Sequence, residues 1–218
     1  MKLLKTFFAF VFFTSTSITA AELSAPQQVI DDTSNEIKLL LKHDRDLLTS
    51  DPAYVYQMVD EVLIPHFDLN RISGLVLGRY WKRASAEQKE TFKHEFKRML
   101  VRTYATAFNE LDDWKINFLK TRMGNKANDV MVRTKISRNG PAVAVDYRMR
   151  DKGEGWKVYD VKIEGMSLIT NYRSSFNRLI RTGGMNGLLT HLTESNDQKI
   201  AEATENPEMK KVAMSAAE

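Results

Sequence analysis

Residues 92–118, FKHEFKRMLVRTYATAFNELDDWKINF, contain the change of hydrophobic period that decides the fold. Up to Leu111 the apolar side chains recur every three or four residues, as in an amphipathic helix, and from about Asp112 they alternate with polar ones, as in a strand. Ser85 and Gln88 form a capping-box pattern that predicts where this helix starts. The stretch therefore predicts a long helix that is followed by a sheet.

The alternation of apolar and polar residues continues after Asp112 and predicts an antiparallel meander of four strands. After the first strand, apolar residues alternate in three more segments, at about 130–136, 143–149 and 156–163. Asn139-Gly140 predicts a hairpin turn. The alternation slips in the last segment, and we expect a β-bulge near Val158 to Asp160 that bends the sheet, although a strand covered on both faces would give the same pattern.

Helical patterns precede and follow the sheet. Their starts carry a capping residue and a first-turn proline, at Ser24 and Pro26 and again at Asp51-Pro52. Pro65 and Gly183-Gly184 predict helix ends. The predicted helical segments are residues 24–48, 51–65, 69–80, 85–111, 168–180 and 188–192.

This order of elements predicts an α+β domain with about five to six helices on one side of a bent antiparallel sheet of about four strands. We expect the long helix to lie along the concave face of the sheet and to leave a pocket there, although a solid core fits the pattern equally well. Residues 21–195 are expected to form a single domain. Residues 196–218 are too polar to pack and predict a disordered tail.

Residues 1–20 have the three parts of a secretory signal. Lys2 and Lys5 form a charged start, an apolar run follows up to Phe13, and small residues precede the expected cleavage after Ala20, within one residue either way. The apolar run is shorter than the ~20 residues that a spanning helix needs. We therefore expect an exported chain, and the absence of cysteine favours a bacterial periplasm.

Composition excludes several kinds of site. Without cysteine there is no disulfide framework, thiol nucleophile or Cys-ligated metal. The net charge is +4, and basic residues alternate with acidic ones along the chain, so we expect no nucleic-acid binding. No nucleotide-binding or cofactor motif is present. The histidines lack the spacing of a metal site, and we expect no metal or cofactor at His43, His66, His94 or His191.

Asp160 is the candidate for chemistry, as the general base of an enzyme with a half-cone pocket. The alternative is an aspartate that is solvated or paired with a basic side chain. The chain is otherwise rich in aromatic and methionine side chains, which suit either a pocket wall or the solid core of an adaptor that binds no ligand.

Two longer segments carry a family resemblance. Residues 72–92, ISGLVLGRYWKRASAEQKETF, and residues 158–176, VYDVKIEGMSLITNYRSSF, resemble the two signature segments of the MlaC family, periplasmic phospholipid carriers also known as toluene-tolerance proteins. Asp51-Pro52 and residues 63–68, LIPHFD, are similar to the family as well. The resemblance covers about Ile30 to Ile200.

The resemblance implies an NTF2-like fold that encloses a deep apolar pocket for acyl chains, and no catalysed reaction. It also implies partners, which are phospholipid, an outer-membrane lipoprotein complex, and an inner-membrane ABC transporter whose periplasmic part is a hexameric substrate-binding protein. The implied role is to maintain the lipid asymmetry of the outer membrane.

For such a pocket we expect the head group to stay at the mouth. Lys82 and Arg83, with Arg71 and Arg79, are candidates to meet phosphate or an anionic membrane, or else are solvated charges at helix ends. The predicted lipid-binding wall consists of Leu75, Tyr80, Phe92, Phe96, Met99, Leu100, Tyr104, Phe108, Val132, Val145, Tyr147, Trp156, Val161, Ile163, Met166, Ile169, Tyr172 and Phe176.

Overall fold

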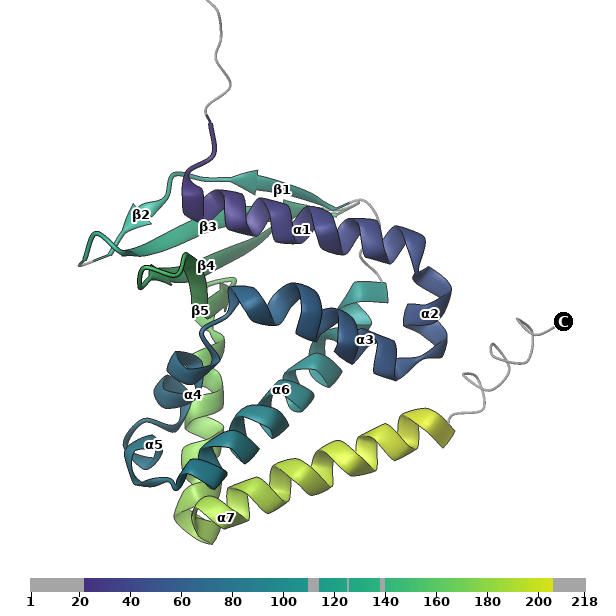
Figure 1. The fold of residues 1–218 in the computed structure, drawn as a ribbon, viewed down its shortest axis with the longest axis vertical. Coiled ribbons are helices and arrows are strands. Elements are labelled where there is room, and N and C mark those ends of the chain that lie inside the picture. Colours follow the sequence, from purple (N-terminus) through teal and green to yellow (C-terminus); the bar gives the residue numbers. More distant parts are fainter. Residues whose placement is uncertain (1–21, 110–113, 125, 138–139, 206–218) are drawn as a thin grey trace, which may run out of the picture.

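The computed structural model describes residues 22–109, 114–124, 126–137 and 140–205, without the side chains of 49, 50, 52, 105–109 and 200–205. The predicted signal lies outside this part of the chain. The described residues form an α+β fold in which a bent antiparallel sheet lies at one end of a set of helices (Figure 1). The predicted fold class is therefore confirmed.

The helices of the first half start at the predicted caps. The Asp51 carboxylate accepts a hydrogen bond from the Ala53 N–H at 2.8 Å, and Ser85 and Gln88 exchange two capping hydrogen bonds at 3.1 and 3.0 Å. The elements are α1 (Ala25–His43), α2 (Arg45–Ser50), α3 (Pro52–Met58), the π-helical η1 (Val59–Leu63), the 3-10 helix η2 (Ile64–His66), α4 (Leu69–Leu77), α5 (Arg79–Arg83) and α6 (Ala86–Asn109).

Two boundaries differ from the prediction. The first predicted helix is divided at Asp44, whose carboxylate accepts a hydrogen bond from the Tyr54 hydroxyl at 2.6 Å and so ties the turn to α3. The second does not end before Pro65, because the chain continues through η1 and η2 to His66. Proline is tolerated in the first turn of a helix, where its missing N–H would have no partner.

The sheet contains the four predicted strands and two short ones. Its order is β1-β3-β4-β5-β6, with β2 paired to β3, and all named pairs are antiparallel. The predicted Asn139-Gly140 turn includes residues 138–139, which lie outside the described residues. The strands are β1 (Lys115–Phe118), β2 (Arg122–Met123), β3 (Asp129–Ser137), β4 (Val143–Asp151), β5 (Trp156–Ile163) and β6 (Met166–Ser167). Because β2 and β6 have two residues each, alternation could not reveal them.

The predicted bulge is confirmed in β5. Arg148 pairs with Asp160 and Met149 pairs with Val158, so Tyr159 is the extra residue. Val158, Tyr159 and Asp160 are all buried. Val158 packs in the cluster under α1, whereas Tyr159 packs in the cluster formed by α4, α6 and α7. The slip in alternation therefore reflects both a bulge and a strand that helices cover on both faces.

The last helix, α7 (Leu168–Glu205), has two halves that meet at an angle (Figure 1). Gly184 lies at the bend with φ 68° and ψ −172°, a conformation that glycine adopts without the cost of a Cβ. The predicted interruption at Gly183-Gly184 is therefore correct.

The predicted start of a disordered tail at residue 196 is wrong, because α7 continues to Glu205. Asn196 is buried and donates a hydrogen bond from Nδ2 to the Glu95 carboxylate at 2.8 Å, and Asp197 pairs with Arg98 at 2.7 Å. These polar contacts hold the second half of α7 on α6, and an apolar pattern does not reveal them. Residues 206–218 lie outside the described part.

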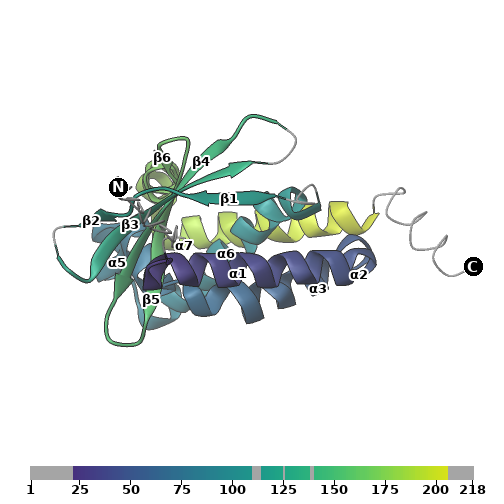
Figure 2. The ribbon, with the colours of Figure 1, turned by 90° about the horizontal axis from the view of Figure 1, so that it is seen from above.

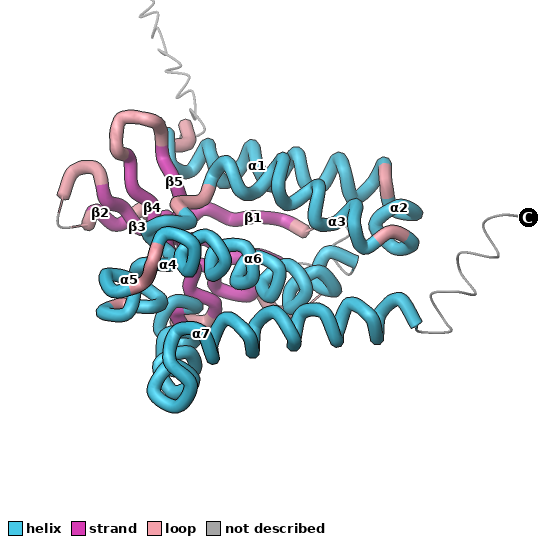
Figure 3. Tube along the Cα trace, turned by 60° about the horizontal axis from the view of Figure 1, so that its bottom comes forward, coloured by secondary structure: helices cyan, strands magenta, loops and turns pink. Residues whose placement is uncertain are grey.

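The long helix does not occupy the expected place on the sheet. The helix that lies along β3 and β5 is α1, while α6 packs against α4 and α7 (Figures 1 and 3). The aromatic rings of α6 interlock with those of α7, since Phe96 lies 5.3 Å from Tyr172 and 5.6 Å from Phe176 between ring centroids. None of the helices in the described part is long and apolar enough to cross a membrane.

Candidate functional site

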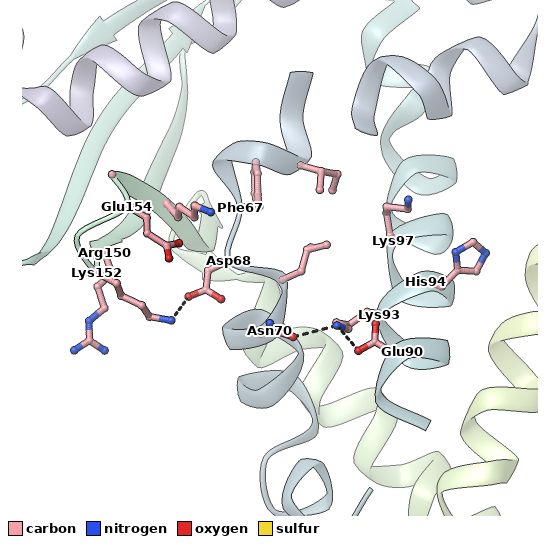
Figure 4. A pocket seen from close by; sticks show the side chains of 14 residues that line it. Phe67, Asp68, Asn70, Glu90, Lys93, His94, Lys97, Arg150, Lys152 and Glu154 are labelled. Atoms are coloured by element: carbon pink, nitrogen blue, oxygen red, sulfur yellow. Dashed lines mark hydrogen bonds and ion pairs between the residues drawn. The ribbon is translucent and has the colours of Figure 1, made fainter. Parts of the chain in front are cut away.

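A polar groove opens between the start of α4, the N-terminal half of α6 and the turn between β4 and β5 (Figure 4). Its volume is about 540 Å³. Apolar side chains lie at its base and charged ones on its rim. We call it the mouth groove, and it is lined by Ile64, Phe67, Asp68, Leu69, Asn70, Glu90, Lys93, His94, Lys97, Arg150, Lys152, Glu154, Gly155 and Lys157.

Ion pairs order the rim of the mouth groove. Lys152 Nζ lies 2.7 Å from an Asp68 carboxylate oxygen, and Lys93 Nζ lies 2.7 Å from Glu90 (Figure 4). Asp68 also caps α4 by accepting the Arg71 N–H at 2.9 Å. Burial works to raise the pKa of Asp68, but the hydrogen bonds from Lys152 and the Arg71 N–H outweigh it and hold that pKa below its usual value.

The first of two apolar cavities lies behind the groove, between α6, α7 and β5. Its volume is about 210 Å³, and we call it the α6 cavity. Its walls are mostly aliphatic and aromatic side chains, with Ser73 and Asp160 at their edges. It is lined by Val59, Leu63, Ile64, Phe67, Leu69, Ile72, Ser73, Lys93, Phe96, Lys97, Leu100, Val101, Tyr104, Tyr159, Asp160, Val161, Leu168, Ile169 and Tyr172.

The second apolar cavity, also of about 210 Å³, lies between α1 and the sheet, and we call it the sheet cavity. The stripe of α1 that faces the strands forms one wall, and the inner residues of the strands form the other. It is lined by Ile30, Thr33, Ser34, Ile37, Leu63, His66, Phe67, Trp114, Ile116, Ile136, Tyr147 and Val158.

Phe67 borders all three spaces. It lies between η2 and α4 and forms a bridge to Val158 of β5, where the Asp68 N–H also donates to the Val158 carbonyl at 2.9 Å. Leu63 is shared by the two apolar cavities. The polar groove and the two apolar cavities therefore adjoin at Phe67, an arrangement that suits a ligand with one polar part and two apolar parts.

Each apolar cavity is lined by a tyrosine whose pKa is raised. Burial raises the pKa of Tyr147, in the sheet cavity, to about 12. Burial and the neighbouring Tyr104 hydroxyl raise the pKa of Tyr172, in the α6 cavity. Both phenols therefore stay neutral at any physiological pH, so neither of them adds an anion to the cavity walls.

The structure brings part of the predicted wall together at these cavities. The α6 cavity is lined by Phe96, Leu100, Tyr104, Val161, Ile169 and Tyr172, and the sheet cavity by Tyr147. Met99 and Phe176 instead border a further cavity of about 400 Å³ in the bend of α7, which Tyr172 also lines.

The other predicted wall residues whose side chains the structure describes border none of these cavities. Phe92 and Val132 are 0% exposed and pack in the helical core and in the cluster under α1, respectively. Met166 is 72% exposed, because β6 is a two-residue strand at the edge of the sheet. Leu75 and Tyr80 pack around the helical core, Trp156 packs under α1, Val145 pairs with Ile163 across the sheet, and the Phe108 side chain lies outside the described residues. Contact of any wall residue with a ligand stays a prediction.

The sequence analysis missed the contribution of the η1–η2 segment and of α1. Leu63 and Ile64 were assigned to a predicted helix and, with Phe67, to a family-like segment, and the predicted wall contained no residue of the first helix, which supplies Ile30 and Ile37 to the sheet cavity. The proline-containing LIPHF sequence was the available signal, since an apolar stretch that cannot form a regular helix often lies at a functional bend.

The basic residues expected at the mouth lie elsewhere. Lys82 and Arg83 are exposed on α5 and do not line the mouth groove. The Arg71 guanidinium lies over the Tyr159 ring, 4.2 Å from its centroid, and Arg79 is stacked on its neighbouring tyrosine. The charged rim comes from α6 and the β4–β5 turn instead.

Asp160 has structural partners that account for its burial. It is 5% exposed, and its carboxylate accepts hydrogen bonds from the Ser167 hydroxyl at 2.8 Å and from the Ile169 N–H at 3.4 Å. Both donors lie at the start of α7, so Asp160 anchors this helix to the sheet. In the described part of the chain, no group of three or more His, Cys, Asp or Glu residues is arranged to hold a metal ion.

Comparison with known families decides where this chain belongs. The model of the family described as MlaC protein matches residues 31–194. The chain is a member of the MlaC family. The resemblance carried by residues 72–92 and 158–176 is thus confirmed.

Two relatives and one solved structure illustrate the family. The chain is 26% identical over 186 residues to the intermembrane phospholipid transport system binding protein MlaC of Haemophilus influenzae, covering 84% of this chain and 87% of that protein. It is 28% identical over 162 residues to the toluene tolerance protein ttg2D of Pseudomonas putida, covering 73% and 74%. A phospholipid-binding protein from Ralstonia solanacearum, solved in complex with a phospholipid, is similar with a TM-score of 0.75 and 33% identity, over 80% of this chain and 98% of that one.

Proposed function

We propose that this MlaC-family chain is a phospholipid carrier, with acyl chains in the α6 and sheet cavities and the head group in the mouth groove. The observation that carries the proposal is the position of Phe67, where one polar opening meets two apolar cavities. A phospholipid has the same division, with one polar head group and two hydrocarbon chains. The names of the relatives and the phospholipid in the R. solanacearum complex support this proposal.

The sizes of the spaces bear on how a lipid fits. Ligand pockets commonly have volumes of ~300–1,000 Å³, and each apolar cavity, at about 210 Å³, is smaller than this range. One such cavity taken together with the adjoining mouth groove of about 540 Å³ falls within this range. An acyl chain therefore uses both a cavity and part of the groove, and the head group lies near the charged rim.

The physical task of such a carrier is to shield hydrocarbon while the lipid crosses water. Two ordinary acyl chains hold roughly 30 methylenes, and exposing them to water costs on the order of 20 kcal/mol at ~0.8 kcal/mol each. Transfer from a bilayer to an apolar cavity exchanges one apolar medium for another, so the net free energy is small. Partners can then set the direction of transfer.

The proposed route follows the family. The chain is exported to the periplasm after its signal is cleaved near Ala20, and it shuttles phospholipid between an outer-membrane lipoprotein complex and an inner-membrane ABC transporter with a periplasmic substrate-binding hexamer. This transport maintains the lipid asymmetry of the outer membrane. The carrier itself catalyses no reaction and needs no cofactor.

Within the cavities, we assign direct lipid contact to the predicted wall residues that line them, together with Phe67. The lining residues assigned to lipid are Phe96, Leu100, Tyr104, Tyr147, Val161, Ile169 and Tyr172.

The test is direct. The mature protein, expressed with its signal and purified from the periplasm without detergent, is extracted with organic solvent, and the extract is analysed by mass spectrometry. We expect phospholipid at a reproducible molar ratio to protein. Several independent preparations without phospholipid, combined with no transfer of labelled lipid between donor and acceptor vesicles, would overturn the proposal.

A further inference from the structure

The face of the sheet turned away from α1 carries a dense set of basic side chains. Residues directly opposite each other in antiparallel strands share a face, so the register of the sheet defines its members. We call it the basic sheet face. Its charged members are Lys115, Arg122, Arg133, Lys135, Arg148, Arg150, Lys157 and Lys162, with Asp129, Asp146 and Asp160.

The positive charge of the protein is concentrated on the basic sheet face. Eight basic and three acidic side chains give the face a net charge of +5, whereas all 218 residues together carry +4. The remainder of the protein is therefore close to neutral. Separation of charge onto one face creates a directional field that an evenly mixed surface does not have.

Helices leave most of this face uncovered. Of the helices, α1 packs on β3 but on the opposite face, where it meets Val130 and Val132. Helices α4 and α7 pack on β5, where Tyr159 and Asp160 are buried, whereas Lys115, Lys135 and Arg148 elsewhere on the face are exposed. In Figure 2 the β3–β4 hairpin projects away from the helices.

Most of the basic side chains on the face also lack a counter-ion. Within the described residues, the ion pair on this face is the one between Arg133 and Asp146, at a long 3.8 Å. On the helical side the pairs are closer, such as Lys97 with Asp60 at 2.7 Å. The basic sheet face is thus available to an external anion.

The composition of the face indicates which kind of partner it fits. Met131 and Ala144 are its apolar members, and no aromatic side chain is exposed on it. Protein interfaces are enriched in aromatic residues and depleted in lysine, whereas an anionic lipid surface attracts lysine and arginine without an apolar anchor. Arg150 and Lys157 belong both to this face and to the lining of the mouth groove.

From these observations we propose that the basic sheet face docks the protein on an anionic bilayer surface, with the mouth groove at the border of the contact. The proposal rests on the carrier function only in that a carrier must meet a membrane to exchange lipid. In this arrangement, a head group enters the groove from the side on which the bilayer lies.

Three exposed or half-buried lysines provide the test, because they form no ion pair in the described part. The face variant combines Lys115→Gln, Lys135→Gln and Lys162→Gln, and the control variant combines Lys42→Gln, Lys82→Gln and Arg83→Gln, which remove the same charge from exposed positions on α1 and α5. Binding of each mature protein is measured by co-sedimentation with vesicles of phosphatidylcholine alone and with ~30% phosphatidylglycerol.

We expect the wild-type protein and the control variant to bind the anionic vesicles and not the neutral ones. A basic side chain near an anionic surface contributes about fivefold in affinity, so the face variant should bind about 100-fold more weakly. Binding should weaken with added salt as the Debye length shortens. Equal loss in both variants, equal binding to both vesicle types, or no vesicle binding by the wild type would overturn the proposal.

Failure of this proposal is distinguishable from failure of the carrier function. Phospholipid in the same preparations is quantified by mass spectrometry after solvent extraction. If the wild type and the face variant retain lipid but vesicle binding does not depend on the face, docking is refuted and the carrier function stands. If the preparations hold no lipid, the carrier function fails independently of docking.

Discussion

Leu100 offers a direct way to block one compartment of the site. It is half-buried on α6 and lines the α6 cavity. We predict that Leu100→Trp places an indole ring in the space that an acyl chain would occupy and weakens lipid binding. Leu39→Trp is the matched control, because Leu39 lies on α1 and is 68% exposed.

The magnitude follows from the cavity. An indole that displaces three methylenes of the chain removes about 2.4 kcal/mol of burial, which is roughly 50-fold in affinity. The folded state should tolerate the change. The added ring atoms enter space beside Leu100 that the lipid-free protein leaves open, so the cost should not exceed the packing strain of about 1–3 kcal/mol that larger side chains cause in a filled core.

The assay is titration of delipidated protein with a fluorescent phospholipid, accompanied by urea unfolding of the lipid-free protein. We expect weaker binding for Leu100→Trp, unchanged binding for Leu39→Trp, and free energies of unfolding within about 2 kcal/mol of wild type for both. If Leu100→Trp unfolds, Leu100→Phe tests the same position with a smaller ring. Wild-type affinity in a folded Leu100 variant would refute the assignment of the α6 cavity to acyl chains.

Three further predictions concern the polar groups that position the site. Asp68→Ala removes the cap of α4 and should lower the free energy of unfolding, measured in urea, by about 1 kcal/mol. Because the pKa of Asp68 is lowered in the folded state, this difference from wild type should be full above ~pH 4 and should vanish as pH falls through the folded pKa. A difference that does not change with pH would contradict the prediction. Asn196→Ala leaves the buried Glu95 carboxylate without one donor and should cost about 1–3 kcal/mol of unfolding free energy, whereas an unchanged urea midpoint would show that the second half of α7 is not anchored there. Asp160→Asn should lower thermal stability but leave lipid transfer between vesicles at the wild-type rate, and loss of transfer in a folded variant would argue for a chemical role of Asp160.

Interactions between residues close in sequence made much of the fold predictable. The capping box at Ser85 and Gln88, the interruption near Gly184 and the bulge at Tyr159 all appear as local patterns, because a cap, a left-handed glycine or a slipped alternation involves only a few consecutive residues. The prediction failed at residue 196 because the contacts of Asn196 are not local in sequence. The partner of Asn196 is Glu95, about a hundred residues away, and no short window of sequence contains both.

For the candidate site, the sequence predicted which face of each helix or strand points inward, but not which inward side chains line a cavity. Periodicity placed both Phe92 and Phe96 on the inner side of α6, but tertiary packing buries Phe92 fully against Phe176 and leaves Phe96 at the wall of a cavity. Which inward side chains meet empty space depends on how several elements fit together, and no single period contains that information.

The sequence by itself determined the fold class, the caps of the main helices, the bend near Gly184, the curvature of the sheet and the membership of the MlaC family. Tertiary structure alone decided that α1, and not α6, lies on the sheet, that Phe67 stands where the mouth groove and the two apolar cavities meet, and that the free face of the sheet concentrates the positive charge. The physical reason is that cavities and charged faces depend on contacts between residues far apart in the sequence. Secondary structure follows from neighbours within a few residues, whereas cavities and charged faces arise where segments far apart in sequence pack together.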